Sequence, residues 1–228
     1  MSITFSSVDI KLCIFDLDGT LVNTISDLAA SVDFAMRSLE LPCHTHEEYT
    51  SYIGDGTQLL IKRSLPDDQK DDSSLLEKAH SIFTKHYSMH FCDTSVVYDG
   101  IKEALFDLKS RGIRLAVLSN KPDAFTKAII GKLFPEGLFD VVMGAKEGVP
   151  KKPDPTQEIE IIIAFGLRKD ECLHVGDSDV DVITAHNAGI KCFGCTWGFR
   201  SYDCLKSANA DHIINSPKEI TDFFAKNS

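Results

Sequence analysis

From Asp99 onward, short apolar runs alternate with segments of helical periodicity, and this alternation limits the possible folds more than any other feature. The apolar runs, with a similar one near the start of the chain, predict strands at Leu12–Phe15, Ile113–Leu118, Phe139–Met143, Leu173–Val175, Ile190–Phe193 and His212–Ile214. The periodic segments predict helices at Gly100–Ser110, Asp123–Leu133, Pro155–Phe165, Asp179–Ala188 and Pro217–Phe224. Because crossover helices join parallel strands, the pattern predicts an α/β fold with a doubly wound, mostly parallel sheet.

Residues 23–97 interrupt this alternation, and we expect them to form a separate helical domain inserted into a core of residues 1–22 and 98–228. Apolar residues recur at helical spacing in Ile25–Leu39 and Leu75–Phe91, and the insertion contains no convincing strand. Both of its connections lie close to the end of the first predicted strand. A domain hinged there could close over a site at that strand and exclude water.

The first predicted strand ends in Asp16-Leu17-Asp18-Gly19-Thr20. Residues two apart on a strand point to the same side, so the carboxylates of Asp16 and Asp18 would share a small volume. Carboxylates that close repel unless a proton or a cation lies between them, and Mg²⁺ prefers oxygen ligands of this kind. The pair predicts a metal-assisted site in which one Asp attacks an electrophile and the other carries a proton. The alternative is a plain turn, since Asp and Gly are common in turns.

Three further polar segments should converge on this pair, because ligands of open α/β sheets bind at the carboxyl ends of the strands. They are Ser119–Lys121 after the second strand, Gly176–Asp181 after the fourth, and Lys151–Pro155 before the intervening helix. Together with the Asp16–Asp18 pair, they supply a nucleophile, hydrogen-bond donors and a cation, which phosphoryl transfer requires. Taken singly, Ser119-Asn120 could merely turn the chain, and Lys152 could be an exposed loop charge.

The four segments, in this order, resemble the motifs of the haloacid dehalogenase superfamily of phosphohydrolases over nearly the whole chain. The resemblance implies a Rossmann-like core with Asp16 as the nucleophile, which would form an aspartyl-phosphate. It implies Asp18 as general acid toward the leaving oxygen and then as base toward water. Lys152 would neutralise charge on the phosphoryl group and Asp16. The phosphate-binding residues implied for the core are Gly19, Ser119 and Asn120.

The same resemblance implies Mg²⁺ as cofactor. Its ligands would be Asp16, the backbone carbonyl of Asp18, and Asp177, with Asp181 as a supporting acidic residue.

The helical insertion resembles the α-helical cap of the phosphoglycolate phosphatase-like branch of this superfamily. The loop of Gly54, Asp55 and Gly56 looks like the cap loop that faces the phosphoryl site, and its glycines allow close approach to a small ligand. Two positions depart from the branch. Asp55 stands where the loops of that branch often carry an amide side chain. A carboxylate there repels an anionic substrate unless Lys62 or Arg63 offsets its charge. Asn23 stands where an Asp is frequent.

We therefore expect a Mg²⁺-dependent phosphatase of a small phosphate monoester, with 2-phosphoglycolate as the leading substrate. A sugar phosphate mutase resembling β-phosphoglucomutase, a pyrophosphatase and a nucleotidase are the enzymatic alternatives. Thr20 favours hydrolysis over mutase chemistry by resemblance. The non-enzymatic alternative is a signalling receiver domain, in which an Asp accepts phosphate as a switch, although such a domain needs no large insertion.

Composition restricts the partners. A net charge of -10 argues against nucleic acid, whose phosphates require Lys and Arg, and no stretch reaches the ~20 apolar residues of a membrane span. A monomer or homodimer acting on a small molecule is expected. Seven irregularly spaced cysteines without a signal segment predict free thiols in the cytoplasm. Cys192 and Cys195 lack the second pair that a metal site would need, and His86 and His90 lack a third ligand.

Overall fold

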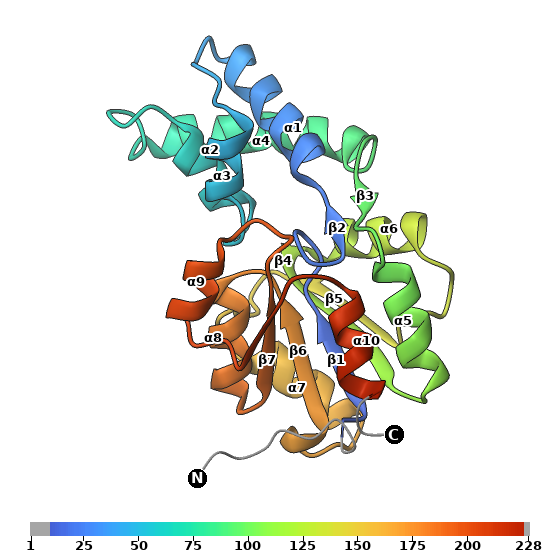
Figure 1. Ribbon diagram of the computed structural model, residues 1–228. Coiled ribbons are helices and arrows are strands. Elements are labelled where there is room, and N and C mark those ends of the chain that lie inside the picture. Colours follow the sequence, from blue (N-terminus) through green and yellow to red (C-terminus); the bar gives the residue numbers. More distant parts are fainter. Residues whose placement is uncertain (1–9, 226–228) are drawn as a thin grey trace.

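The computed structural model describes residues 10–225, which form a parallel sheet covered by helices and a helical insertion beyond one end of the sheet (Figure 1). The six strands follow the spatial order β5-β4-β1-β6-β7-β8, and every neighbouring pair is parallel. The strands are β1 (Leu12–Phe15), β4 (Arg114–Pro122), β5 (Val141–Ala145), β6 (Cys172–Gly176), β7 (Lys191–Cys195) and β8 (His212–Ile214). The predicted fold class is confirmed.

Helices cover both faces of this sheet, because the apolar strand residues alternate between two cores. Cys13 and Phe15 of β1 belong to one core, whereas Leu12 and Ile14 belong to the other. The first core includes residues of α5 (Ile101–Ser110), α6 (Asp123–Leu133) and α10 (Lys218–Ala225). The second includes residues of α7 (Thr156–Ala164), α8 (Asp179–Ala188) and α9 (Tyr202–Ser207). The sequence analysis did not anticipate α9 or the 3₁₀ turn Lys169–Glu171.

The insertion has its own hydrophobic core, formed by four helices. They are α1 (Ile25–Ser38), α2 (His46–Tyr52), α3 (Thr57–Ser64) and α4 (Ser73–His90). The expectation that this segment contains no strand is wrong at its two ends. There β2 (Val22–Asn23) and β3 (Val96–Val97) form a short antiparallel ribbon, which brings the entering and leaving chains together. Strands this short carry no readable periodicity.

Asp27 of α1 fastens the leaving chain to the entering one. Its carboxylate accepts hydrogen bonds from the backbone N–H and the hydroxyl of both Thr94 and Ser95, at 2.5 to 3.2 Å. Burial alone would raise the pKa of Asp27, but these donors lower it below its ordinary value. The base of the insertion is therefore held by a buried carboxylate as well as by the ribbon.

The cysteines are free thiols. Cys192 and Cys195 are an odd number of residues apart on β7, so they belong to the cores on opposite faces of the sheet. Burial raises the pKa of both thiols, as expected for unreactive core residues.

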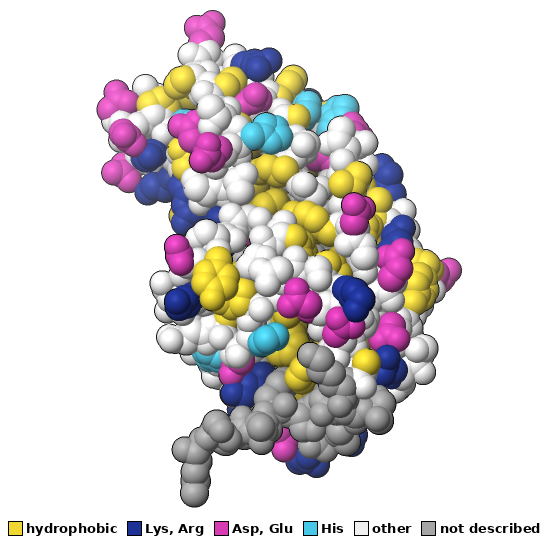
Figure 2. Space-filling view, viewed as in Figure 1, with side chains coloured by type: hydrophobic (Ala, Val, Ile, Leu, Met, Phe, Trp, Pro, Cys, Tyr) yellow, Lys and Arg dark blue, Asp and Glu magenta, His cyan; other side chains and the backbone are white. Residues whose placement is uncertain are grey.

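On the face shown in Figure 2, basic and acidic side chains are interspersed. Among residues 10–225, no helix is both long and apolar enough to cross a membrane. The first nine residues, on which the expectation of no signal segment depends, lie outside the described part of the chain.

Candidate active site

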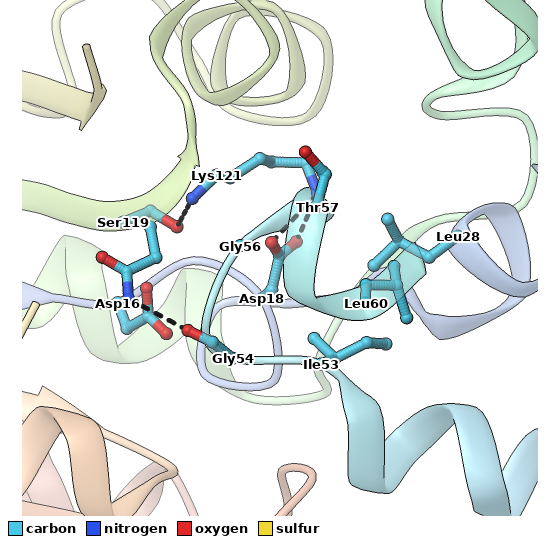
Figure 3. A pocket seen from close by; sticks show the side chains of 11 residues that line it. Asp16, Asp18, Leu28, Ile53, Gly54, Gly56, Thr57, Leu60, Ser119 and Lys121 are labelled. Carbon is cyan, nitrogen blue, oxygen red and sulfur yellow. Dashed lines mark hydrogen bonds and ion pairs between the residues drawn. The ribbon is translucent and has the colours of Figure 1, made fainter. Parts of the chain in front are cut away.

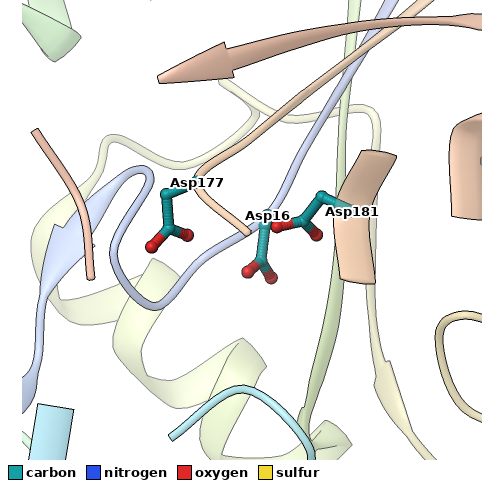
Figure 4. A group of neighbouring side chains, drawn as sticks. All are labelled: Asp16, Asp177 and Asp181. Carbon is teal, nitrogen blue, oxygen red and sulfur yellow. The ribbon is translucent and has the colours of Figure 1, made fainter. Parts of the chain in front are cut away.

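Three carboxylates meet at the carboxyl ends of β1 and β6. Asp16 follows β1 directly, Asp177 follows β6, and Asp181 lies in the first turn of α8 (Figure 4). One oxygen of each lies within 4.8 Å of the others. The parallel register of β1 and β6, which pairs Phe15 with Val175, puts their following residues side by side.

Lys152 lies between two of these carboxylates. Its Nζ is 3.0 Å from Asp16 Oδ1 and 2.6 Å from Asp181 Oδ1, and the residue is buried. It is therefore not an exposed loop charge, unlike its neighbour Lys151. Asp16 Oδ1 is itself buried and has no hydrogen bond, although the ammonium lies close to it. The ion pair with Lys152 is thus the one polar contact of this oxygen among the described residues.

Asp177 is packed against the backbone of the first motif. Its Oδ1 accepts a hydrogen bond from the Thr20 hydroxyl at 3.0 Å, and its Oδ2 accepts one from the Phe199 N–H at 2.7 Å. Gly19 has φ +89°, and a Cβ there would lie 2.3 Å from Asp177 Oδ2. Only glycine permits this conformation and this approach together.

Burial and neighbouring charges together set the pKa values of the three acids. Burial raises the pKa of Asp16 to about 6, and burial together with repulsion from Asp181 and Asp16 raises the pKa of Asp177 to about 8. Burial would also raise the pKa of Asp181, but Lys152 and His174 hold it far below its ordinary value. The raised pKa values show that the protein alone does not fully compensate negative charge on Asp16 and Asp177. A hard divalent cation would supply the missing positive charge and would fit these carboxylate oxygens.

Both carboxylate oxygens of Asp181 accept hydrogen bonds from other groups of the protein. Its Oδ2 accepts from the backbone N–H and the hydroxyl of Ser178, which caps α8, and its Oδ1 accepts from Lys152. His174 Nε2 lies 3.4 Å from Oδ1, and His174 Nδ1 lies 2.5 Å from Glu158 Oε1. Burial alone would lower the pKa of His174, but the two carboxylates raise it to about 9. Acidic and basic side chains thus alternate in a row that ends at Asp16; its members, in order, are Glu158, His174, Asp181, Lys152 and Asp16.

Asp18 is held by a residue to which the sequence analysis assigned no role. The Nζ of Lys121 lies 2.9 Å from both carboxylate oxygens of Asp18, and the Thr24 hydroxyl donates to Oδ1 at 2.6 Å. In Figure 3, Asp18 lies between Lys121 and the loop of the helical insertion. Lys121 follows Ser119 and Asn120 near the carboxyl end of β4. That position was the sequence signal that could have assigned it to the site.

Ser119 and Asn120 lie at the same edge. The Ser119 hydroxyl accepts a hydrogen bond from the Lys121 N–H at 3.3 Å. The Asn120 side chain donates to the carbonyls of Lys152 and of Gly54 in the insertion, both at 3.0 Å. Asn120 therefore does more than turn the chain, because it ties the helical insertion to the core.

A pocket with a cavity volume of about 40 Å³ separates the core from the insertion. It is lined by Asp16, Asp18, Leu28, Ile53, Gly54, Gly56, Thr57, Leu60, Ser119, Asn120 and Lys121. Since one water needs at least about 10–15 Å³ on such a measure, the pocket holds only a few water-sized groups. The site is therefore small.

The insertion loop contributes two glycines to this pocket, Gly54 and Gly56, both with positive φ. Asp55 between them is not among the lining residues, and its Oδ2 pairs with Arg63 at 2.6 Å. Arg63 thus offsets the carboxylate that departs from the family pattern, whereas Lys62 pairs elsewhere.

Two other side chains considered in the sequence lie outside this pocket. Asn23, the second departure, accepts from the Ile25 N–H at the start of α1. His86 contacts the Ser31 hydroxyl at 3.0 Å and stacks on His90, and within the described chain the one acidic or histidine cluster with metal-binding spacing is that of Figure 4.

Comparison with known proteins identifies the family. The family model described as haloacid dehalogenase-like hydrolase matches residues 13–195. Phosphoglycolate phosphatases of Vibrio parahaemolyticus and Mannheimia succiniciproducens are 33% identical over 221 residues and 36% identical over 209 residues. These alignments cover 95% and 90% of this chain, and 97% and 93% of the two relatives.

A solved structure gives the same result. The crystal structure of a predicted phosphoglycolate phosphatase from Haemophilus somnus has a TM-score of 0.87 at 30% identity, covering 94% of this chain and 97% of its own. The prediction of a hydrolytic enzyme is confirmed, and the chain belongs to the haloacid dehalogenase-like hydrolase family.

Proposed function

We propose that this protein is a Mg²⁺-dependent phosphomonoesterase that acts on a small phosphate ester through an aspartyl-phosphate, with 2-phosphoglycolate as the leading substrate. The observation that carries the proposal is Asp16, which lines the pocket and whose carboxylate lies beside the buried Lys152 ammonium and two further acids. The names of the curated relatives support the choice of ester.

Asp16, Asp177 and the backbone carbonyl of Asp18 would hold the metal. Asp181 would support it indirectly, because its oxygens already accept from Ser178 and Lys152. When bound, Mg²⁺ supplies the positive charge that offsets the carboxylates and the phosphoryl oxygens.

Asp16 would attack the phosphorus, so that a new P–O bond to its carboxylate forms while the bond to the ester oxygen breaks. The Ser119 hydroxyl and the Asn120 backbone N–H would hold the phosphoryl oxygens, and Lys152 would compensate their charge. Asp18 would donate a proton to the leaving oxygen. It would then accept one from the water that attacks the same phosphorus, releasing inorganic phosphate and regenerating Asp16.

The small volume of the pocket favours a compact ester over a nucleotide. The covering loop of the insertion, tied to the core through Asn120, suits a turnover site that must exclude water. A receiver domain has no need of such a cover.

A phosphate release assay tests the proposal. 2-Phosphoglycolate, sugar phosphates, nucleotides and pyrophosphate would be compared, each with Mg²⁺ and with a chelator. We expect catalytic release of phosphate that chelation abolishes and Mg²⁺ restores. A sugar phosphate isomerised without net release would indicate a mutase. Release limited to one phosphate per protein molecule, or unaffected by the chelator, would contradict the proposal.

A further inference from the structure

Lys121 is a buried lysine in the pocket to which the mechanism proposed above assigns no contact with the substrate. Its side chain is 2% exposed, and its Nζ lies 5.1 Å from the centre of the Tyr87 ring of α4. Both carboxylate oxygens of Asp18 lie 2.9 Å from this ammonium. Keeping a cation this far from water is costly unless its hydrogen bonds are used.

Among the described residues that line the pocket, Lys121 is the one cationic side chain. Three other basic groups lie near the insertion loop: Lys151 is exposed and does not line the pocket, and two arginines have partners outside it. Arg63 pairs with Asp55, and Arg200 donates to the carbonyls of Thr50 and Ile53. A second anionic group of a substrate, if it lies inside the pocket, would therefore meet Lys121.

The position of Lys121 relative to Asp18 limits where that anionic group can be. As general acid, Asp18 must come within about 2.6–3.2 Å of the leaving oxygen. Adding the 2.9 Å from Asp18 to Nζ puts the ammonium within roughly 6 Å of that oxygen. A carboxylate on the carbon that bears the ester oxygen can bridge this gap, because its own oxygens extend toward the ammonium.

We infer that Lys121 selects substrates that carry a carboxylate on the carbon bearing the phosphate ester. An ammonium has three N–H groups. Two can serve the two oxygens of Asp18, and the third can turn from the Tyr87 side chain to a substrate carboxylate. The apolar residues Leu28, Ile53 and Leu60 line the same pocket and offer an anion no alternative partner. The inference rests on the proposed function, since it assumes that Asp18 protonates the leaving oxygen.

The test compares two esters of the same length, 2-phosphoglycolate and 2-hydroxyethyl phosphate, which differ in whether the terminal carbon is a carboxylate or an alcohol. The kcat/KM values of both are measured with Mg²⁺ for the wild type and for Lys121→Met and Lys121→Arg. Lys127→Met is the matched control, because it removes the same charge from an exposed lysine that pairs with Asp123.

We expect the ratio of the two kcat/KM values to fall at least about 30-fold in Lys121→Met, because the carboxylate loses the one cationic side chain that lines the pocket. Lys121→Arg should keep part of the ratio, and Lys127→Met should keep all of it. If Lys121 only positions Asp18, both esters will lose activity by the same factor. An unchanged ratio would therefore overturn the inference.

A wild-type measurement keeps the inference testable even if the variants do not fold. Moving the carboxylate one carbon farther, in the phosphate ester of 3-hydroxypropionate, should lower kcat/KM relative to 2-phosphoglycolate. Equal values would overturn the inference but leave the phosphatase intact. No phosphate release from any of the three esters would instead refute the proposed function itself.

Discussion

Replacing Lys152 with methionine removes the cation that compensates two buried carboxylates. The Lys152 ammonium lies 3.0 Å from Asp16 Oδ1 and 2.6 Å from Asp181 Oδ1, and its side chain is 3% exposed. Methionine fills a similar volume, so the loss is mainly electrostatic. Breaking a buried ion pair on one side costs about 3–5 kcal/mol in the free energy of unfolding.

The cost of Lys152→Met should depend on pH. Without the ammonium, the pKa of Asp16, already raised to about 6 by burial, rises further. A carboxylate whose pKa is higher in the folded state destabilises the protein more as pH rises, because the folded protein must then give up a proton to reach the charged form. We therefore expect the full loss in alkaline solution and a smaller one in mild acid.

Urea denaturation of the metal-free protein, followed by circular dichroism, measures this difference at about pH 8 and about pH 5.5. Lys127→Met is again the control, because its pair with Asp123 is exposed and should be worth less than about 1 kcal/mol at both pH values. A loss in Lys152→Met that equals the control, or that does not change with pH, would refute the electrostatic reasoning.

Three further predictions concern the surroundings of the site. Asp27→Ala leaves the N–H and hydroxyl groups of Thr94 and Ser95 without their acceptor, so it should lower the free energy of unfolding in urea titration by about 2–4 kcal/mol. A loss below about 1 kcal/mol would contradict the stabilising role given to these hydrogen bonds. His174 has a pKa raised from 6.5 to about 9, so its contribution to stability is complete below about pH 6.5 and is lost as pH rises through 9. The difference in unfolding free energy between wild type and His174→Gln should shrink over that range, and a constant difference would be inconsistent with a buried charged imidazole. Arg200→Met, which frees the carbonyls at the end of α2 from the core, should raise KM in steady-state kinetics more than it lowers kcat, and an unchanged KM would argue against a role in holding the insertion.

The sheet was predictable because buried parallel strands are apolar throughout and end in polar motifs. The same rule indicated that Asp16, Ser119 and Asp177 would approach one another, since each lies at or just after the carboxyl end of a strand on the same edge. Lys152 was harder to interpret, because an isolated lysine beside a proline is usually exposed. Its burial follows from two carboxylates that are distant in sequence.

Tertiary contacts determined what the sequence analysis missed. The β2–β3 ribbon has two residues on each side, too few for any pattern. The bond between Lys121 and Asp18 joins positions more than a hundred residues apart. Two local signals were present but not used. Thr45 and Glu48 form the capping box that starts α2, and the odd spacing of the two β7 cysteines already excluded a shared site.

The most direct test is to look for a phosphoryl group on Asp16 itself. The protein would be mixed with 2-phosphoglycolate and Mg²⁺, quenched rapidly in acid, and digested for mass spectrometry, with Asp16→Asn as the control. The proposed mechanism predicts one added phosphoryl group on the wild-type peptide that contains Asp16. It also predicts none on the variant, whose phosphate release should fall by several orders of magnitude. Parental turnover by Asp16→Asn, or rapid turnover without a labelled wild-type peptide, would contradict it.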